Sequence, residues 1–202
     1  MNPKEYFKQV CEEKREWIYA SAAISLNNKL VAGGGADKEF HRLLSESSDT
    51  TVFGANTFRE SASEPDGYPD RVIAILSRSL DIDAEHSLFK KDKEAFIYTE
   101  SGDQEKIRSL KQNNSLLKIK QGIWTPEAIV EDLRDEGKQK ILIDGGGQTY
   151  NFFVPSIKDW FLTLVPIFAS DHKPDFWNSG KKNLELIWSK QYDGRVFTRL
   201  SS

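Results

Sequence analysis

Three consecutive glycines, Gly145, Gly146 and Gly147, form the segment of this sequence that points most directly to chemistry. They follow residues 140–144, whose centre 141–143 is apolar, and precede Gln148 and Thr149, which predicts a buried strand, a turn and a helix in that order. Backbone N–H groups at such a turn can bind an anion, and glycines allow a phosphate to approach closely. The alternative is a tight turn without a ligand. No Gly-Lys-Ser/Thr follows, so the segment is not a Walker A loop.

A second glycine triplet, residues 33–35, follows the predicted strand at 17–26. It could form a flexible lid over a site, and a plain mobile loop explains it at least as well. Two glycine triplets at strand ends suggest one shared crevice, which is the usual ligand position in open α/β sheets.

Several competing chemistries have no support in the sequence. There is no Gly-x-Ser-x-Gly, no Tyr-x-x-x-Lys, no His-Glu-x-x-His and no zinc-deaminase motif. The three histidines, His41, His86 and His172, have no partners at ligand spacing and are interpreted as surface residues. Cys11 is the single cysteine, so no internal disulfide and no metal site are predicted, and a reducing compartment is expected.

The length of the chain indicates one full domain, or one domain with additions. The chain has 202 residues, and 28 Lys and Arg against 31 Asp and Glu give a net charge of −3. This balance argues against binding to nucleic acid. The polar start and a most apolar stretch of only ten residues, 160–169, predict neither a signal peptide nor a membrane span. We therefore expect a cytoplasmic protein that does not bind membranes.

The hydrophobic pattern alternates between strands and helices. Asn2-Pro3 and Thr125-Pro126 are helix-start signals, and Asp103 is a predicted N-cap. Helices are expected at residues 3–14, 37–48, from 103, 125–137 and 148–154, and strands at 17–26, 50–53, 71–77, 95–99, 140–144, 160–168, 184–188 and 196–200. This order predicts an α/β protein with three layers, α-β-α, in which a mixed, mostly parallel sheet has an antiparallel C-terminal edge.

Four segments in order carry a family resemblance. Residues 52–59 (VFGANTFR) and 68–78 (YPDRVIAILSR) resemble the dihydrofolate reductase superfamily. Together with residues 19–32 and the Asp-Gly-Gly-Gly of 144–147, they look like the reductase domain of riboflavin biosynthesis. The resemblance implies a dihydrofolate reductase-like reductase domain at 17–202, preceded by an N-terminal helical extension at 1–16.

The resemblance also implies that NADPH is the cofactor. Ser77 and Arg78 correspond to the position of the adenosine 2′-phosphate, and a guanidinium beside a hydroxyl suits a phosphate. The other residues expected at the cofactor are Gly54, Asn56 and Thr57 for the nicotinamide and pyrophosphate side, Thr99 and Ser101 for the adenine half, and Gly145, Gly146, Gly147 and Thr149 for the pyrophosphate.

On the substrate side, the resemblance points to Ser25, Asn27, Lys29 and Arg59. Asn27 and Lys29 take the catalytic positions, with Asn27 standing where the family has Asp and Lys29 able to hold a substrate phosphate. Because Asn27 cannot ionise, weak turnover is expected, together with a gain in Asn27→Asp.

The function implied is that of 5-amino-6-(5-phosphoribosylamino)uracil reductase, which reduces a ribosylamino group to ribitylamino. Two alternatives remain open: a reductase of dihydrofolate, a pterin or another small molecule, and a nucleotide-binding protein that has lost catalysis. A homodimer is also expected, because residues 160–168 look too apolar for a half-exposed edge. An ordinary core strand explains the same run.

Overall fold

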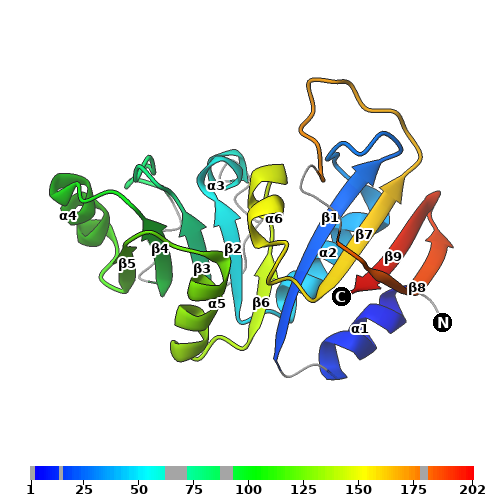
Figure 1. The fold of residues 1–202 in the computed structure, drawn as a ribbon, viewed down its shortest axis with the longest axis horizontal. Coiled ribbons are helices and arrows are strands. Elements are labelled where there is room, and N and C mark those ends of the chain that lie inside the picture. Colours follow the sequence, from blue (N-terminus) through cyan, green and yellow to red (C-terminus); the bar gives the residue numbers. More distant parts are fainter. Residues whose placement is uncertain (1–2, 14–15, 62–71, 87–92, 178–181) are drawn as a thin grey trace.

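A single nine-stranded sheet forms the centre of the molecule (Figure 1). The computed structural model describes residues 3–13, 16–61, 72–86, 93–177 and 182–202. Its strands lie in the order β5-β4-β3-β2-β6-β1-β7-β9-β8. The strands are β1 (Trp17–Ser25), β2 (Thr50–Gly54), β3 (Val72–Leu76), β4 (Ala95–Thr99), β5 (Leu117–Gln121), β6 (Lys140–Ile143), β7 (Asp159–Val165), β8 (Glu185–Tyr192) and β9 (Arg195–Ser201).

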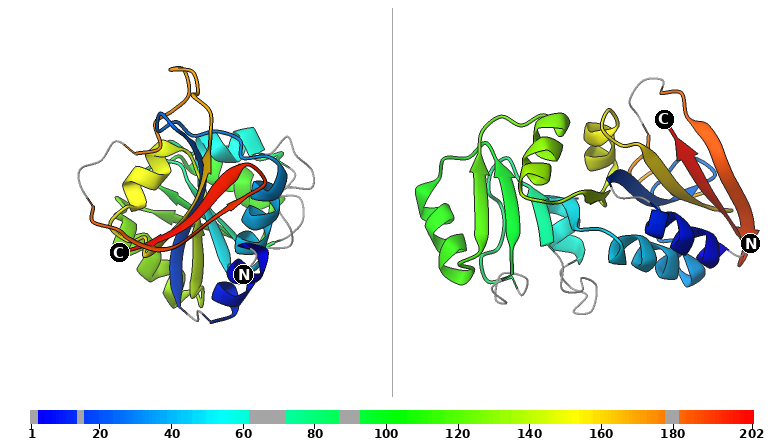
Figure 2. Two further views of the ribbon diagram at one scale, coloured as in Figure 1. Left: turned by 90° about the vertical axis from the view of Figure 1, so that its right-hand side faces the viewer. Right: turned by 90° about the horizontal axis from the view of Figure 1, so that it is seen from below.

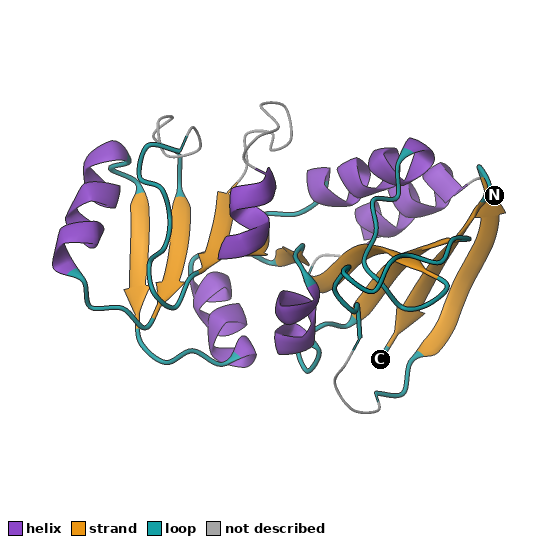
Figure 3. Ribbon diagram, turned by 90° about the horizontal axis from the view of Figure 1, so that it is seen from above, coloured by secondary structure: helices purple, strands orange, loops and turns teal. Residues whose placement is uncertain are grey.

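Helices cover both faces of this sheet, as Figure 3 shows from above. The helices are α1 (Pro3–Glu13), α2 (Gly35–Glu46), α3 (Ala55–Ser61), α4 (Gln104–Asn113), α5 (Pro126–Asp135) and α6 (Gly147–Phe153). Side chains of α5 and α6 pack on one face, with Val52 and Ile143 among the strand residues they bury. Leu142 and Phe53 point to the other face, where α1, α2, α3 and α4 pack. The three-layer α/β architecture is confirmed.

The strand directions also match the prediction. The pairs from β5 to β7 are all parallel, and only β9 runs against its neighbours β7 and β8. The C-terminal edge is thus antiparallel, as predicted, and the hairpin turn that joins β8 and β9 has positive φ angles of 50° at Asp193 and 70° at Gly194.

Two elements were not predicted, and several differ in length. The helix α3 follows β2 without a loop, and β5 lies at the sheet edge between α4 and α5. The strand β8 extends to Tyr192 rather than ending at 188, and α2 begins at Gly35 rather than at 37. The N-caps were correct: the Asp103 side chain accepts from Glu105 and Lys106, and Thr125 accepts from Ala128. Residues 68–71 of the family pattern lie outside the described residues.

The apolar run at 160–168 is explained by the second of the two predicted possibilities, an ordinary core strand. Its strand, β7, lies between β1 and β9 and pairs with both, and Trp160 and Phe161 are buried. The argument for a dimer from a half-exposed edge is therefore wrong, because this strand is interior. The homodimer itself stays a prediction.

The N-terminal helix α1 packs on the same core as the rest of the chain. Phe7 and Val10 are buried, and the Phe7 ring meets Phe40 and Phe161 edge-on at 5.0 and 5.3 Å between centroids. Figure 2 shows this helix beside the C-terminal strands. The boundary between residues 1–16 and 17–202 stays a prediction. Among the described residues, none of the helices is long and apolar enough to cross a membrane.

Candidate functional site

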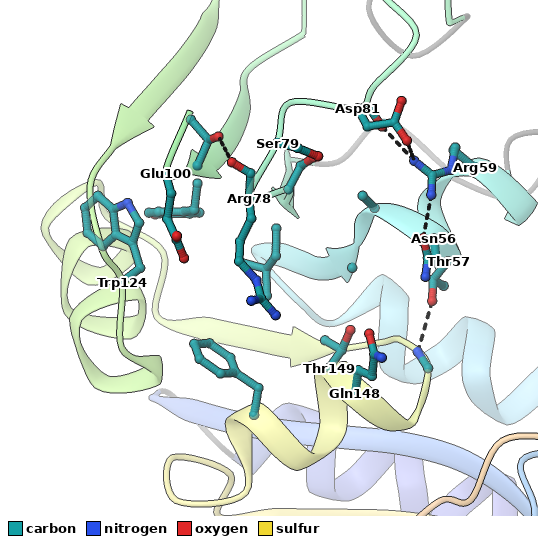
Figure 4. Close-up of a pocket in the computed structure, with 18 of the residues that line it drawn as sticks. Asn56, Thr57, Arg59, Arg78, Ser79, Asp81, Glu100, Trp124, Gln148 and Thr149 are labelled. Atoms are coloured by element: carbon teal, nitrogen blue, oxygen red, sulfur yellow. Dashed lines mark hydrogen bonds and ion pairs between the residues drawn. The ribbon is translucent and has the colours of Figure 1, made fainter. Parts of the chain in front are cut away.

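A pocket of about 790 Å³ opens at the carboxyl ends of β2, β3, β4 and β6. Parallel strands present their carboxyl ends at one edge of a sheet, and that edge is the common ligand site of open α/β folds. Figure 4 shows the side chains that surround it. The lining includes Gly54, Ala55, Asn56, Thr57, Arg59, Glu60, Leu76, Ser77, Arg78, Ser79, Asp81, Tyr98, Thr99, Glu100, Trp124, Ile129, Gly146, Gly147, Gln148, Thr149, Phe152 and Pro174.

Most residues predicted for the cofactor meet in this pocket. Gly54, Asn56, Thr57, Ser77, Arg78, Thr99, Gly146, Gly147 and Thr149 all line it. Arg59, predicted on the substrate side, lines it as well, whereas Ser101 and Gly145 are not among the lining residues. Ser25, Asn27 and Lys29 lie outside it.

The glycine turn is joined to α3 by a hydrogen bond. The Gly146 N–H donates to Thr57 Oγ1 at 2.9 Å, so residues 89 positions apart form one wall of the pocket. Gly54 packs closely against the first turn of α6, because a Cβ at this position would lie 2.5 Å from Thr149 Oγ1. Arg59, also on α3, donates to Asp81 Oδ2 at 2.6 Å and to Asn56 Oδ1.

Close packing, rather than left-handed backbone, explains two of the three glycines of the turn, Gly145 and Gly147. Gly146 has φ −76° and ψ 175°, which any residue can adopt. A Cβ at Gly147 would lie 2.2 Å from the carbonyl oxygen of Asp175, and one at Gly145 would lie 2.7 Å from Thr149 Cβ. Gly146 alone has space, since its nearest neighbour would be Thr57 Oγ1 at 3.7 Å.

Arg78 is the cation that the pocket offers to a ligand. Its backbone is fixed because Thr99 Oγ1 donates to the Arg78 carbonyl oxygen at 3.0 Å. Its side chain extends into the middle of the pocket (Figure 4), and within the described part of the chain the guanidinium has no ion-pair partner. Thr99 also accepts from the Ser101 N–H at 3.0 Å, so these two residues stabilise the loop.

Asn27 uses its side chain to join two loops. Its Nδ2 donates to the Ala169 carbonyl oxygen at 2.8 Å, and its Oδ1 accepts from the Ala169 N–H at 3.0 Å and from Ser25 Oγ at 2.7 Å. Lys29 is likewise paired, with Nζ 2.9 Å from Asp175 Oδ1. Both residues predicted to be catalytic therefore use their side-chain polar groups in contacts with other residues of the chain.

This geometry gives Asn27→Asp a structural consequence. A carboxylate would face the Ala169 carbonyl oxygen, and the donor that now satisfies this oxygen would be lost. We expect the free energy of unfolding to fall by about 1–3 kcal/mol at pH 7, measured by urea unfolding. The loss should become smaller below the pKa of the new carboxyl, because the protonated acid can donate again. An unchanged stability across this pH range would contradict the assignment of these bonds.

A charged cluster that the sequence reasoning missed lies at the end of β6. The ring of His41, on α2, places Nε2 3.0 Å from Asp144 Oδ2, directly before the glycine turn. The negative charge of Asp144 raises the pKa of His41 to about 9 although partial desolvation of the ring lowers it, so His41 is protonated at neutral pH. The interpretation of His41 as an ordinary surface histidine is wrong, because it has this partner.

Asp37 completes the cluster from the first turn of α2. Burial raises the pKa of the Asp37 carboxyl, although a hydrogen bond from Thr163 and the nearby charges of His41 and Arg195 lower it. A signal for this grouping was present in the sequence: Asp37 and His41 are four residues apart, which places them on one face of the predicted helix. The partner Asp144 is 103 residues away and gave no such signal.

The fold and the pocket together define an α/β protein with a dihydrofolate reductase-like fold and a pocket at the carboxyl ends of its parallel strands. Residues 12–184 match the family model described as the RibD C-terminal domain, and the chain belongs to that family.

Solved structures show the same fold at low sequence identity. A pyrimidine reductase-like protein from Corynebacterium diphtheriae has a TM-score of 0.79 and 19% identity, covering 96% of this chain and 98% of that one. The riboflavin biosynthesis reductase Rib7 of Saccharomyces cerevisiae has a TM-score of 0.72 and 13% identity, covering 98% and 96%. Dihydrofolate reductase from Enterococcus faecalis, complexed with NADP(H) and RAB-propyl, has a TM-score of 0.57 and 13% identity, covering 92% and 95%. A comparison with curated protein sequences found no match.

Proposed function

We propose that this chain is an NADPH-dependent reductase of the riboflavin-pathway type, acting on a phosphorylated ribosylaminopyrimidine. The observation that carries the proposal is the Arg78 guanidinium, which extends into the pocket without an ion-pair partner in the described part of the chain. A cation placed in this way suits a phosphate. Membership of the RibD C-terminal domain family gives the reaction class, and the neighbour named as a riboflavin biosynthesis reductase agrees with it.

The residues present fit a dinucleotide. Arg78 and Ser77 would hold the 2′-phosphate, the turn at Gly146 and Gly147 would contact the pyrophosphate, and Trp124 and Phe152 offer apolar rings in the same lining. NADPH, when bound, supplies the hydride. The remaining tasks of the protein are to orient the substrate and to supply the proton that accompanies the hydride.

We place the substrate beside the glycine turn, next to the pair of His41 and Asp144, which lies outside the pocket lining. Reduction of an imine adds hydride to carbon and a proton to nitrogen, so a proton donor near the glycine turn is useful. His41 keeps its proton at neutral pH, and its side chain is 37% exposed. We therefore propose the pair of His41 and Asp144 for substrate contact, in place of Asn27 and Lys29.

The test of the proposal is a titration of NADPH and NADH into the purified protein, followed by nicotinamide fluorescence. NADPH should bind more tightly than NADH. Arg78→Ala should lose tenfold to more than a hundredfold in NADPH affinity, because charge-assisted hydrogen bonds contribute roughly 1.5–3 kcal/mol. NADH affinity should change much less.

Arg108→Ala serves as the matched control. Arg108 is an exposed residue of α4 outside the pocket lining, and its substitution removes the same charge. NADPH affinity should stay within about twofold of wild type. Equal affinities of the wild type for NADPH and NADH, or an unchanged Arg78→Ala, would refute the cofactor assignment.

A second candidate function is nucleotide binding without reduction. It is favoured by the hydrogen bonds of Asn27, which occupy the position where the family pattern has an acid. The two functions are separated by mixing the NADPH complex with the ribosylaminopyrimidine and following nicotinamide absorbance over one turnover. Oxidation of NADPH supports the reductase, and its absence supports the binding protein.

A further inference from the structure

A carboxylate, that of Glu100, lines the same pocket as Arg78. The register of the parallel strands β3 and β4 ends with Leu76 opposite Tyr98, and Arg78 and Glu100 each follow two residues beyond this pair. The bonds from the Ser77 N–H to the Tyr98 carbonyl and from Thr99 Oγ1 to the Arg78 carbonyl, both 3.0 Å, hold these strand ends together. Opposite charges are thus presented from neighbouring strands.

Both side chains face the ligand space rather than each other. Arg78 and Glu100 line the pocket, and Figure 4 shows both directed into it. Within the described part of the chain Glu100 has neither a hydrogen bond nor an ion pair at its carboxylate, and no bridge joins it to Arg78. The lining carboxylate of Asp81 differs, because it is neutralised by Arg59 at 2.6 Å. Glu100 therefore adds an uncompensated negative charge near the predicted phosphate position.

The two charges favour different nucleotides. A guanidinium stabilises a ribose 2′-phosphate, whereas a carboxylate accepts hydrogen bonds from free ribose hydroxyls and repels a phosphate. We propose that Glu100 is a specificity-determining residue that reduces the preference Arg78 gives to 2′-phosphorylated nucleotides. This inference rests on the proposed function, since it assumes that the pocket binds an adenine dinucleotide.

The experiment uses two nucleotide fragments as probes, adenosine 2′,5′-bisphosphate and AMP, titrated by calorimetry into the full chain. Glu100→Gln should bind the bisphosphate about three- to tenfold more tightly than wild type, which is the size of a repulsion between exposed charges several ångströms apart. AMP affinity should stay unchanged or weaken. The gain should shrink in 0.5 M salt, because screening reduces such interactions.

Glu105→Gln is the matched control, since Glu105 is exposed on α4, outside the pocket lining. It changes the net charge equally and should leave the ratio of the two affinities as in wild type. Glu100→Ala should reproduce the gain of Glu100→Gln, which separates the charge from any contact of the glutamine amide. An unchanged ratio in both Glu100 variants, with both probes binding, overturns this inference alone. Failure of wild type to bind either probe overturns the proposed function and this inference together.

Discussion

Replacing Asp159 with alanine should lower the free energy of unfolding by about 3–5 kcal/mol. The Asp159 carboxylate is buried at the start of β7, where it accepts from Arg199 Nε at 2.9 Å and from Trp17 Nε1 at 2.7 Å. The Arg199 side chain is only 11% exposed. Removal of the acid would leave a guanidinium and an indole N–H inside the protein without their acceptor, and an uncompensated buried charge is among the most costly defects.

Two variants show whether the buried charge is responsible. Asp159→Asn keeps the size and one acceptor but removes the charge, so we expect an intermediate loss. Arg42→Ala breaks the exposed pair of Arg42 with Glu46 on α2, and it should change stability by no more than about 0.5 kcal/mol. Urea unfolding measures all three. A loss below about 1 kcal/mol for Asp159→Ala would mean that water reaches this pair.

The main elements could be predicted because local signals and tertiary packing agree in them. The strand β1 has a continuous uncharged sequence and is buried on both faces by helices, as parallel central strands are. The helix α5 has an N-cap at Thr125 followed by Pro126, and its Ile129, Val130 and Leu133 form the buried stripe. Neither element depends on a distant partner for its type.

The strand β5 could not be predicted because its stabilising partners are distant. Its sequence, LKIKQ, carries two lysines, which is atypical of a sheet core. In the structure Lys118 bridges Glu94 and Glu136, and Lys120 bridges Asp132 and Glu136. Asp132 lies on α5, Glu136 is the residue after α5, and Glu94 is the residue before β4. The two lysines of this edge strand therefore find their partners only when the chain has folded.

The candidate site likewise has a part that could be predicted from sequence and a part that depends on distant partners. The turn at Gly146 was predicted because a glycine triplet follows a predicted strand, whereas Gly54 and Arg78 were implied by the family resemblance. All three line the pocket, because parallel strands bring their carboxyl ends together. The contacts of Asn27 with Ala169 and of His41 with Asp144 span 142 and 103 residues. Such long-range hydrogen bonds determine which polar side chains remain available to a ligand, and they cannot be predicted from a local sequence pattern.

The largest effect on binding is expected for Gly146→Val, which should lower NADPH affinity by roughly a hundredfold or more. The backbone at Gly146 is extended, with φ −76°, so a β-branched residue fits without strain. A Cβ there meets only Thr57 Oγ1, at 3.7 Å, and the residue lines the pocket. The two added methyl groups would occupy the space in which the pyrophosphate approaches the turn. Loss of one or two charge-assisted bonds of roughly 1.5–3 kcal/mol each accounts for the magnitude.

Gly147→Ala distinguishes this effect from damage to the fold. Its Cβ would lie 2.2 Å from the Asp175 carbonyl oxygen, so the segment around Asp175 must move, and a stability loss of about 1–3 kcal/mol is expected. Gly146→Val should instead keep the unfolding midpoint of wild type while losing the nucleotide. Fluorescence titration and thermal unfolding of the two variants measure both properties. If Gly146→Val binds NADPH within about threefold of wild type, the turn has only a structural role. The added methyl groups would fill the open space at residue 146, so they can leave affinity unchanged only if the nucleotide does not approach the turn there.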